Sequence, residues 1–162
     1  LPSAALREAV GDAVRATLPA TTVATDRLVV RGPSYVAASV EARVAGDGSR
    51  TVADLEAAVT GALDAFLHPL TGGPAGEGWA FGDLPGPGEV FARLEDIEGV
   101  DHVAALAIRY EGTDATVTVR EGDTPPRVAE DVLVTGGTHE VDATAVGATA
   151  GGPTTAGIGG DR

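Results

Sequence analysis

The first part of the chain has the apolar spacing of a helix. Apolar residues recur at every fourth position, at Leu6, Val10, Val14 and Leu18. Side chains at this spacing share one helix face, and Ser3 is a favourable N-cap residue. We therefore predict a helix over residues 3–17, closed by Pro19 because proline cannot continue it.

Alternation of apolar and polar positions then predicts strands. In residues 35–45 one face carries Val36, Ala38, Val40, Ala42 and Val44, and the other carries Ser39, Glu41 and Arg43. This period of two is typical of a strand that is buried on one side. The Val-rich residues 21–31 predict another strand, which Gly32-Pro33 ends.

Two further helices follow from the same reasoning. Thr51 and Asp54 have the spacing of a capping box, and they precede a helix to about Leu67. Its apolar face would hold Val52, Leu55, Val59, Leu63 and Phe66. Pro87 favours the first turn of a short helix, and Gly99 stands where a left-handed cap would end it.

The last third of the chain predicts strands only. Residues 100–110 carry Leu106, Ile108 and Tyr110 on one face, and residues 115–121 form a second strand. Val132 and Val134 indicate a short strand, and Gly136-Gly137 a hairpin turn to a partner over residues 138–146.

These elements predict an α+β fold: a mainly antiparallel sheet with two or three helices packed on it. We expect an N-terminal helix in residues 1–20 that links to an upstream domain, and an α+β domain over residues 21–146. Residues 147–162 are rich in Gly and Thr and predict a flexible tail. Residues 68–86 predict a long Gly/Pro-rich loop, and loops of this length are usually functional, bound to a partner or mobile.

Charge excludes several function classes. The chain has 24 acidic residues against 11 basic ones, all of them Arg, and a net charge of −13. Such a charge repels phosphate, which argues against nucleic-acid binding, and no apolar stretch is long enough to enter a membrane. Acidity without any Lys is typical of a halophile, whose concentrated salt screens the self-repulsion, and the alternative is an ordinary acidic mesophilic protein. Dilution into low salt should then loosen the chain.

No motif predicts catalysis, a metal site or a cofactor. Without Lys there is no phosphate-binding P-loop, and without Cys there is no thiol nucleophile or Cys-ligated metal. The three histidines, His68, His102 and His139, lack the i, i+4 spacing of a helical metal pair. None of the four serines lies in a Gly-x-Ser-x-Gly context, so we predict that the protein is not an enzyme.

Two of the six aromatic residues, Trp79 and Phe81, fall in the Gly-rich loop. They predict either a loop that folds back on its own core or an anchor for a partner, since aromatic side chains dominate interface energetics. The sequence favours neither alternative.

Several stretches resemble the C-terminal part of the baseplate J-like family, the wedge proteins of contractile phage tails and contractile injection systems. The most specific are Leu67-His68-Pro69-Leu70-Thr71-Gly72-Gly73-Pro74 and Gly78-Trp79-Ala80-Phe81-Gly82. Residues 30–36, 89–103 and 134–141 follow the same order, the last as the family's closing hairpin.

The resemblance implies a structural, non-catalytic subunit in an oligomeric baseplate ring. Its partners would be other wedge subunits, the tail hub and sheath-proximal proteins, and its place the baseplate of a virion or particle assembled in the cytoplasm. The matching positions would determine fold or interface: Arg31, Tyr35, His68, Pro69, Gly73, Trp79, Phe81 and Gly99. Alternatives are a small-molecule-binding α+β module, which predicts a closed pocket, and a hydrolase using paired carboxylates, which predicts a cleft.

Overall fold

A computed structural model describes residues 2–19, 28–112 and 115–145. The chain divides into two compact units, Leu1–Ser34 and Tyr35–Arg162. Each unit is described by itself. The predicted tail over residues 147–162 and most of the predicted strand over residues 21–31 lie outside the described residues.

The first unit contains the predicted N-terminal helix, α1 (Ala4–Thr17). The Ser3 hydroxyl accepts a hydrogen bond from the Leu6 N–H at 3.1 Å, which confirms the predicted cap. The predicted apolar face is not buried within this unit, because the side chain of Leu6 is 55% exposed and that of Val10 43%. The described end of the predicted strand, residues 28–31, is not a strand; Val29 is 74% exposed and pairs with no described strand.

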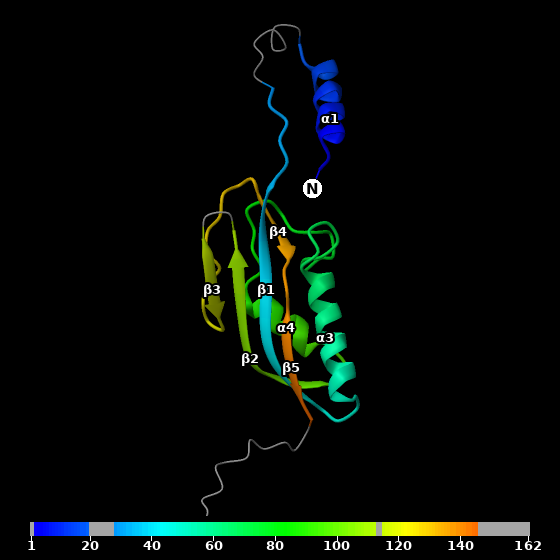
Figure 1. Ribbon diagram of the computed structural model, residues 1–162, viewed down its shortest axis with the longest axis vertical. Coiled ribbons are helices and arrows are strands. Elements are labelled where there is room, and N and C mark those ends of the chain that lie inside the picture. Colours follow the sequence, from blue (N-terminus) through cyan, green and yellow to red (C-terminus); the bar gives the residue numbers. More distant parts are fainter. Residues whose placement is uncertain (1, 20–27, 113–114, 146–162) are drawn as a thin grey trace, which may run out of the picture. The chain divides into compact units, whose positions relative to one another are not determined.

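The second unit is built on a mixed five-stranded sheet (Figure 1). β1 (Ser34–Gly46) lies in its centre and pairs antiparallel with β2 (Val100–Glu111), which pairs antiparallel with β3 (Thr116–Arg120). On the other side of β1 lie β4 (Val132–Gly136) and β5 (Glu140–Thr144). The fold is therefore α+β with a mostly antiparallel sheet, as predicted.

The predicted hairpin at Gly136-Gly137 is wrong. β5 pairs with β1 in parallel, from Glu41 beside Glu140 to Ala45 beside Thr144, and β4 also neighbours β1. The chain continues along β1 instead of turning back, because the Gly137 N–H donates to the Ala38 carbonyl at 2.9 Å. A double glycine permits both paths, and the contacts with β1 decide between them.

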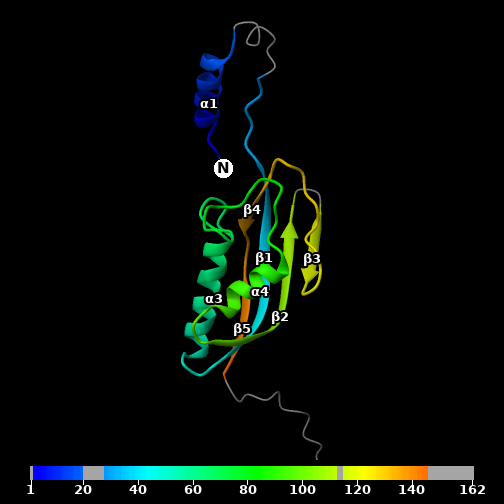
Figure 2. The ribbon, with the colours of Figure 1, turned by 180° about the vertical axis from the view of Figure 1, so that it is seen from behind.

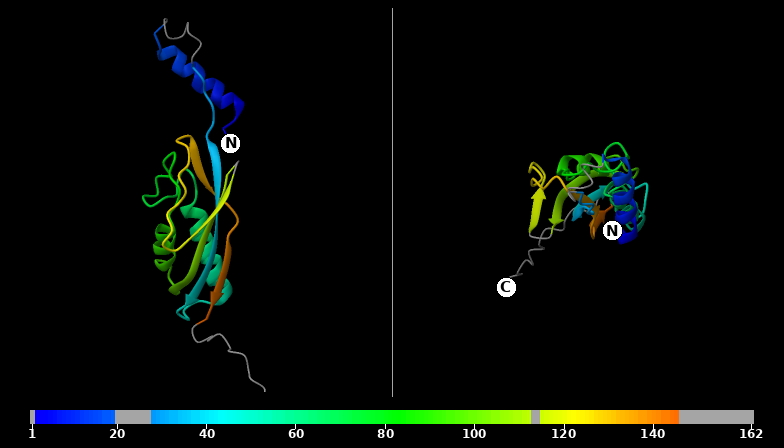
Figure 3. Two further views of the ribbon diagram at one scale, coloured as in Figure 1. Left: turned by 90° about the vertical axis from the view of Figure 1, so that its left-hand side faces the viewer. Right: turned by 90° about the horizontal axis from the view of Figure 1, so that it is seen from above.

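Both helices of this unit pack on one face of the sheet. α3 (Val52–Phe66) and α4 (Pro87–Glu95) lie behind the strands in Figure 1 and in front of them in Figure 2, and Figure 3 shows the two layers from the side. The predicted inward faces are confirmed for β1, β2 and α3, except that Val52 is 39% exposed at the first turn of α3. The core between the layers includes Val40, Val44, Leu55, Val59, Leu63, Val90, Leu94, Leu106 and Ile108.

Gly99 lies in the turn between α4 and β2. Its φ is +98°, in the left-handed region that favours glycine. It does not form the predicted helix cap, because α4 already ends at Glu95 with Asp96 as its C-cap. Gly99 lies instead in the turn that the Val100 N–H closes on the Ile97 carbonyl at 3.0 Å. The Gly99 carbonyl accepts a hydrogen bond from the Asp47 N–H at 3.0 Å, and a Cβ on Gly99 would lie 2.9 Å from Cδ of Arg50. Gly99 therefore connects the turn before β2 with the turn between β1 and α3.

Candidate functional site

The loop between α3 and α4 folds back on the end of α3. The Phe66 carbonyl accepts two hydrogen bonds, from the Gly73 N–H at 2.8 Å and from Trp79 Nε1 at 3.0 Å. The rings of Trp79 and Phe66 meet edge to face, with 5.4 Å between their centroids. Trp79 is half-buried against the core, so it closes the loop on its own domain.

His68 and Pro69 shape the same loop. Nδ1 of His68 accepts the N–H groups of Leu70 at 3.3 Å and Thr71 at 3.2 Å, and it lies 2.8 Å from the Thr71 hydroxyl. The Pro69 carbonyl accepts the Trp79 N–H at 3.1 Å. The exposed His68 ring is thus a turn-forming group, and no cluster of His, Asp or Glu among the described residues could hold a metal ion.

Close backbone contacts explain the glycines of the loop. A Cβ on Gly72 would lie 2.1 Å from the Phe66 carbonyl oxygen and 2.6 Å from that of His68. Gly73 has a φ of +77°, and a Cβ there would lie 2.7 Å from the Gly78 carbonyl oxygen. The run from Leu67 to Trp79 is therefore one interlocked unit in which side chains have no room at these positions.

The far end of the loop is held by the sheet. The Gly82 N–H donates to the Val132 carbonyl of β4 at 2.8 Å. The hydroxyl of Tyr110, on β2, donates to the carbonyl of Pro85, which is fully buried. Burial raises the pKa of Tyr110 above its ordinary value of 10, and the negative charge of Glu89 adds to this, so the hydroxyl keeps its proton as a donor.

Phe81 lies between two anchored residues, Trp79 and Gly82, and is 60% exposed. Leu70, on the same loop, is 71% exposed. Each of the two predicted roles therefore applies to one residue of the aromatic pair. Trp79 packs on the core of its own domain, whereas the Phe81 ring is exposed to solvent. An exposed aromatic side chain on a fixed loop is the arrangement expected of an interaction anchor.

The remaining predicted positions lie elsewhere. Arg31 is exposed in the first unit, where it lines a hollow of about 350 Å³ with Pro2 and Arg7. Tyr35 is half-buried at the start of β1. The structure thus brings together His68, Pro69, Gly73, Trp79 and Phe81 in one loop, while Gly99 lies in the turn between α4 and β2.

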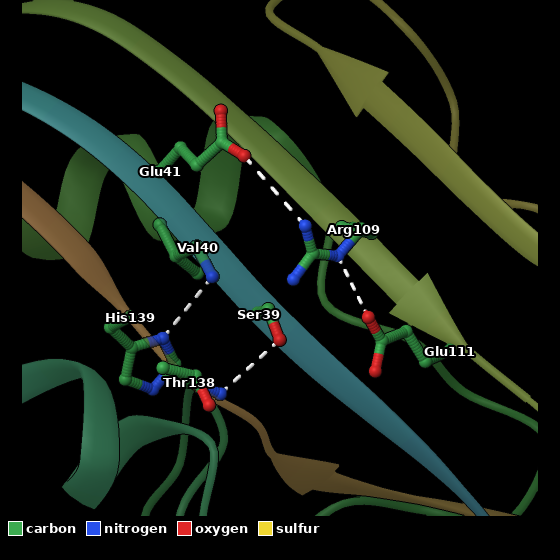
Figure 4. A network of polar contacts seen from close by, with 7 residues as sticks. All are labelled: Ser39, Val40, Glu41, Arg109, Glu111, Thr138 and His139. Atoms are coloured by element: carbon green, nitrogen blue, oxygen red, sulfur yellow. Dashed lines mark hydrogen bonds and ion pairs between the residues drawn. The ribbon is translucent and has the colours of Figure 1, made fainter.

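His139 forms a bridge that the sequence did not indicate. Its Nδ1 accepts the Val40 N–H at 3.1 Å, and the neighbouring Thr138 N–H donates to the Ser39 hydroxyl at 3.2 Å (Figure 4). Nε2 lies 3.5 Å from Oδ1 of Asp64 on α3, and the side chain is 1% exposed. Nε2 makes no hydrogen bond among the described residues, so His139 is held by β1 alone, where the strand is interrupted between β4 and β5.

This environment favours the neutral imidazole. Burial lowers the pKa of His139 below its ordinary 6.5, and the carboxylate of Asp64 opposes this only in part. Protonation at Nδ1 would also remove the acceptor for Val40. Because Nδ1 accepts, the proton of the neutral ring is on Nε2, which points toward Asp64.

We predict that His139 makes the domain less stable as the pH falls below 6.5. Below this pH the unfolded chain binds a proton at His139 that the folded chain does not, so unfolding is favoured by up to about 1.4 kcal/mol per pH unit. Above pH 6.5 the ring is neutral in both states and the contribution is constant. Urea unfolding between pH 5 and 8 measures this slope.

The matched variant is His139→Asn, since the Asn oxygen can accept from Val40 without titrating. It should flatten the slope just below pH 6.5. An equal slope in the wild type and His139→Asn would refute the assignment.

The face of the sheet opposite α3 and α4 is uncovered by any other part of residues 35–112 and 115–145. Arg109 lies on it, 2.8 Å from the Glu111 carboxylate and 4.0 Å from that of Glu41 (Figure 4). A hollow of about 650 Å³ lies on this face, with small and charged side chains in its lining, among them Glu41, Arg43, Ala105, Ala107, Arg120 and Asp142.

The hollow lies on an open face, which differs from the closed pocket that the binding-module alternative predicts. Glu41 and Glu140 are neighbours on it, but the Glu41 side chain is 58% exposed and Glu140 is also exposed, so both carboxylates stay solvated.

Comparisons with known proteins add no further assignment. No protein-family model matches the chain, and no curated protein matches it. None of the described helices is both long and apolar enough to cross a membrane.

Proposed function

We propose that this chain is a structural subunit of the baseplate of a contractile phage tail or contractile injection particle. It would act through contacts with other wedge subunits, the tail hub and sheath-proximal proteins, without catalysis, in a ring assembled in the cytoplasm. The supporting observation is that the two most specific stretches of the resemblance, residues 67–74 and 78–82, form one interlocked loop that presents Phe81.

The geometry of the loop supports a role in binding. Trp79 and Gly82, on either side of Phe81, are both fixed by hydrogen bonds to the domain. Less conformational freedom is then lost when Phe81 is covered by a partner, and preorganisation of this kind favours affinity. Phe81 therefore meets two requirements of an anchor, an apolar side chain and a fixed position.

The charge of −13 supports the same kind of contact, if the chain works in the concentrated salt of a halophilic archaeon or its virus. Salt screens exposed ion pairs, whereas burial of an aromatic ring is not weakened in this way. Interfaces whose stability differs between the extended and contracted states would let the ring switch, as bistable interfaces do in other assemblies.

We expect Phe81→Ala in the full-length protein to reduce the number of assembled baseplates at least about tenfold, since a central anchor contributes 2 kcal/mol or more at each interface. Counting particles by electron microscopy measures this. Val117→Ala is the control, because Val117 is also exposed, at 37%, but lies on β3. Normal assembly with Phe81→Ala, from a protein that is folded by circular dichroism, would contradict the role of the loop.

A further inference from the structure

The open face of the sheet alternates long and short side chains across its two central strands. In four successive rows, a residue of β1 lies beside one of β2, and one member is long and the other short. The rows are Ala37 with Glu111, Ser39 with Arg109, Glu41 with Ala107, and Arg43 with Ala105. The face is therefore a series of projections and gaps.

The charged residues of this face also follow a pattern across the strands. One row runs over four strands in the order Glu140, Glu41, Ala107 and Arg120, with its acid on β5 and its base on β3. Three strand spacings separate the ends, roughly 14 Å, so Glu140 and Arg120 of one chain are too far apart to pair. Among the described residues, neither has an ion-pair partner within 4.0 Å.

We propose that two copies of this chain pair through their open sheet faces, about a two-fold axis that runs parallel to the strands between β1 and β2. Rotation by 180° about this axis leaves each row at the same position along the strands and reverses the order of the strands across the sheet. β5 of one copy then faces β3 of the other, and β1 faces β2. This inference does not depend on the proposed baseplate function.

The two-fold arrangement satisfies both patterns at once. Glu140 of each copy faces Arg120 of the other, and Glu41 faces the gap over Ala107. The long Arg43 of each copy faces the short Ala105 of the other in the same way. Packed sheets lie about 10 Å apart, which leaves room for side chains to interdigitate, and a self-complementary patch is what a two-fold interface requires.

The distribution of the arginine residues favours coverage of this face by a protein partner over its exposure to solvent. Residues 35–145 contain six arginines, and three of them, Arg43, Arg109 and Arg120, lie on the open face. The exposed acids of this face are Glu41, Glu111, Glu140 and Asp142, so it is close to neutral in a chain of charge −13. Two copies can therefore approach here with less repulsion than elsewhere.

Charge reversal tests the pairing. We expect the wild-type 162-residue chain to sediment as a dimer, and Arg120→Glu or Glu140→Arg to weaken the dimer at least tenfold, since each places like charges in contact at two symmetric positions. The double variant Arg120→Glu with Glu140→Arg should restore the dimer. Arg93→Glu and Glu95→Arg, on α4, make the same charge changes on the other layer and should have no effect.

Three results would overturn the proposal. These are a wild-type chain that stays monomeric at every soluble concentration, a dimer that neither single variant weakens, and a double variant that stays as weak as the singles.

Cross-linking provides a second test that does not depend on ionic strength, and the chain has no native Cys to interfere. Chains with Arg120→Cys and chains with Glu140→Cys, when combined, should be joined by a bifunctional thiol cross-linker about 10 Å long, because the two positions face each other across the packed sheets. Each variant alone should cross-link much less. A direct disulfide is not expected, because it requires Cα atoms within about 7 Å of each other. Equal cross-linking in the separate and mixed samples would exclude this register.

Discussion

Trp79→Ala is expected to lower the free energy of unfolding of the domain by about 3–5 kcal/mol, whereas Phe81→Ala should change it by less than about 0.5 kcal/mol. The Trp79 ring packs edge-on against Phe66, and its Nε1 donates to the Phe66 carbonyl at 3.0 Å. Removing the ring leaves a space at the end of α3 and releases the loop. Phe81 is 60% exposed and has little contact to lose.

Urea unfolding followed by circular dichroism measures both values, since Trp79 is the only Trp and its replacement removes that fluorescence. Trp79→Phe keeps a ring but loses the Nε1 donor. It should lower the free energy of unfolding less than Trp79→Ala does, because the smaller ring still packs against Phe66. Similar losses for Trp79→Ala and Phe81→Ala would contradict the division of the aromatic pair.

Gly72→Ala is expected to destabilise the domain by at least about 4 kcal/mol, in the range seen when a substitution displaces backbone. The new Cβ would lie 2.1 Å from the Phe66 carbonyl oxygen, so the chain must move at this point. That carbonyl accepts from both Gly73 and Trp79, so the movement breaks the bonds that close the loop. A shift in the denaturation midpoint without a change in m-value measures this loss.

Gly61→Ala is the control, and it should change the stability of the domain in the opposite direction. Gly61 lies within α3, and a Cβ there would meet nothing within 4 Å. Because Ala is a better helix former than Gly, Gly61→Ala should stabilise the domain by up to about 1 kcal/mol. A Gly72→Ala variant as stable as the wild type would show that the loop is not closed in this way.

Local patterns in the sequence predicted most of the elements of the second unit. The alternation from Val36 to Val44 identified the buried face of β1, because a strand buried on one side shows its period directly. The spacing from Leu55 to Phe66 identified the buried face of α3 for the same reason. The left-handed conformation of Gly99 was indicated by a glycine after a helical pattern, but the residue lies in the turn beyond the Asp96 cap of α4 and does not cap the helix itself.

The errors came from contacts between residues far apart in the chain. Gly136-Gly137 has the composition of a turn, but Thr138 and His139 bond to Ser39 and Val40, 99 residues earlier, and hold the chain along β1. No local pattern carries this information. The same limit applied to His139, whose role depends on the backbone of β1.

The candidate site was only half predictable. The composition of residues 68–86 identified a loop with two aromatic residues, but not which of them contacts the core. That outcome depends on the Phe66 carbonyl, which lies within hydrogen-bonding distance of Trp79 only after the glycines have turned the chain. The open face of the sheet became visible only once the register of β1, β2, β3 and β5 was known.

Our central proposal is that this chain is a baseplate subunit anchored through Phe81. Electron cryo-microscopy of contractile particles purified from cells that express the chain tests it most directly. We expect density for the domain over residues 35–145 in a ring at the base of the sheath, with the Phe81 ring covered by a neighbouring subunit. Particles that lack the chain, or a ring in which Phe81 still faces solvent, would contradict the account.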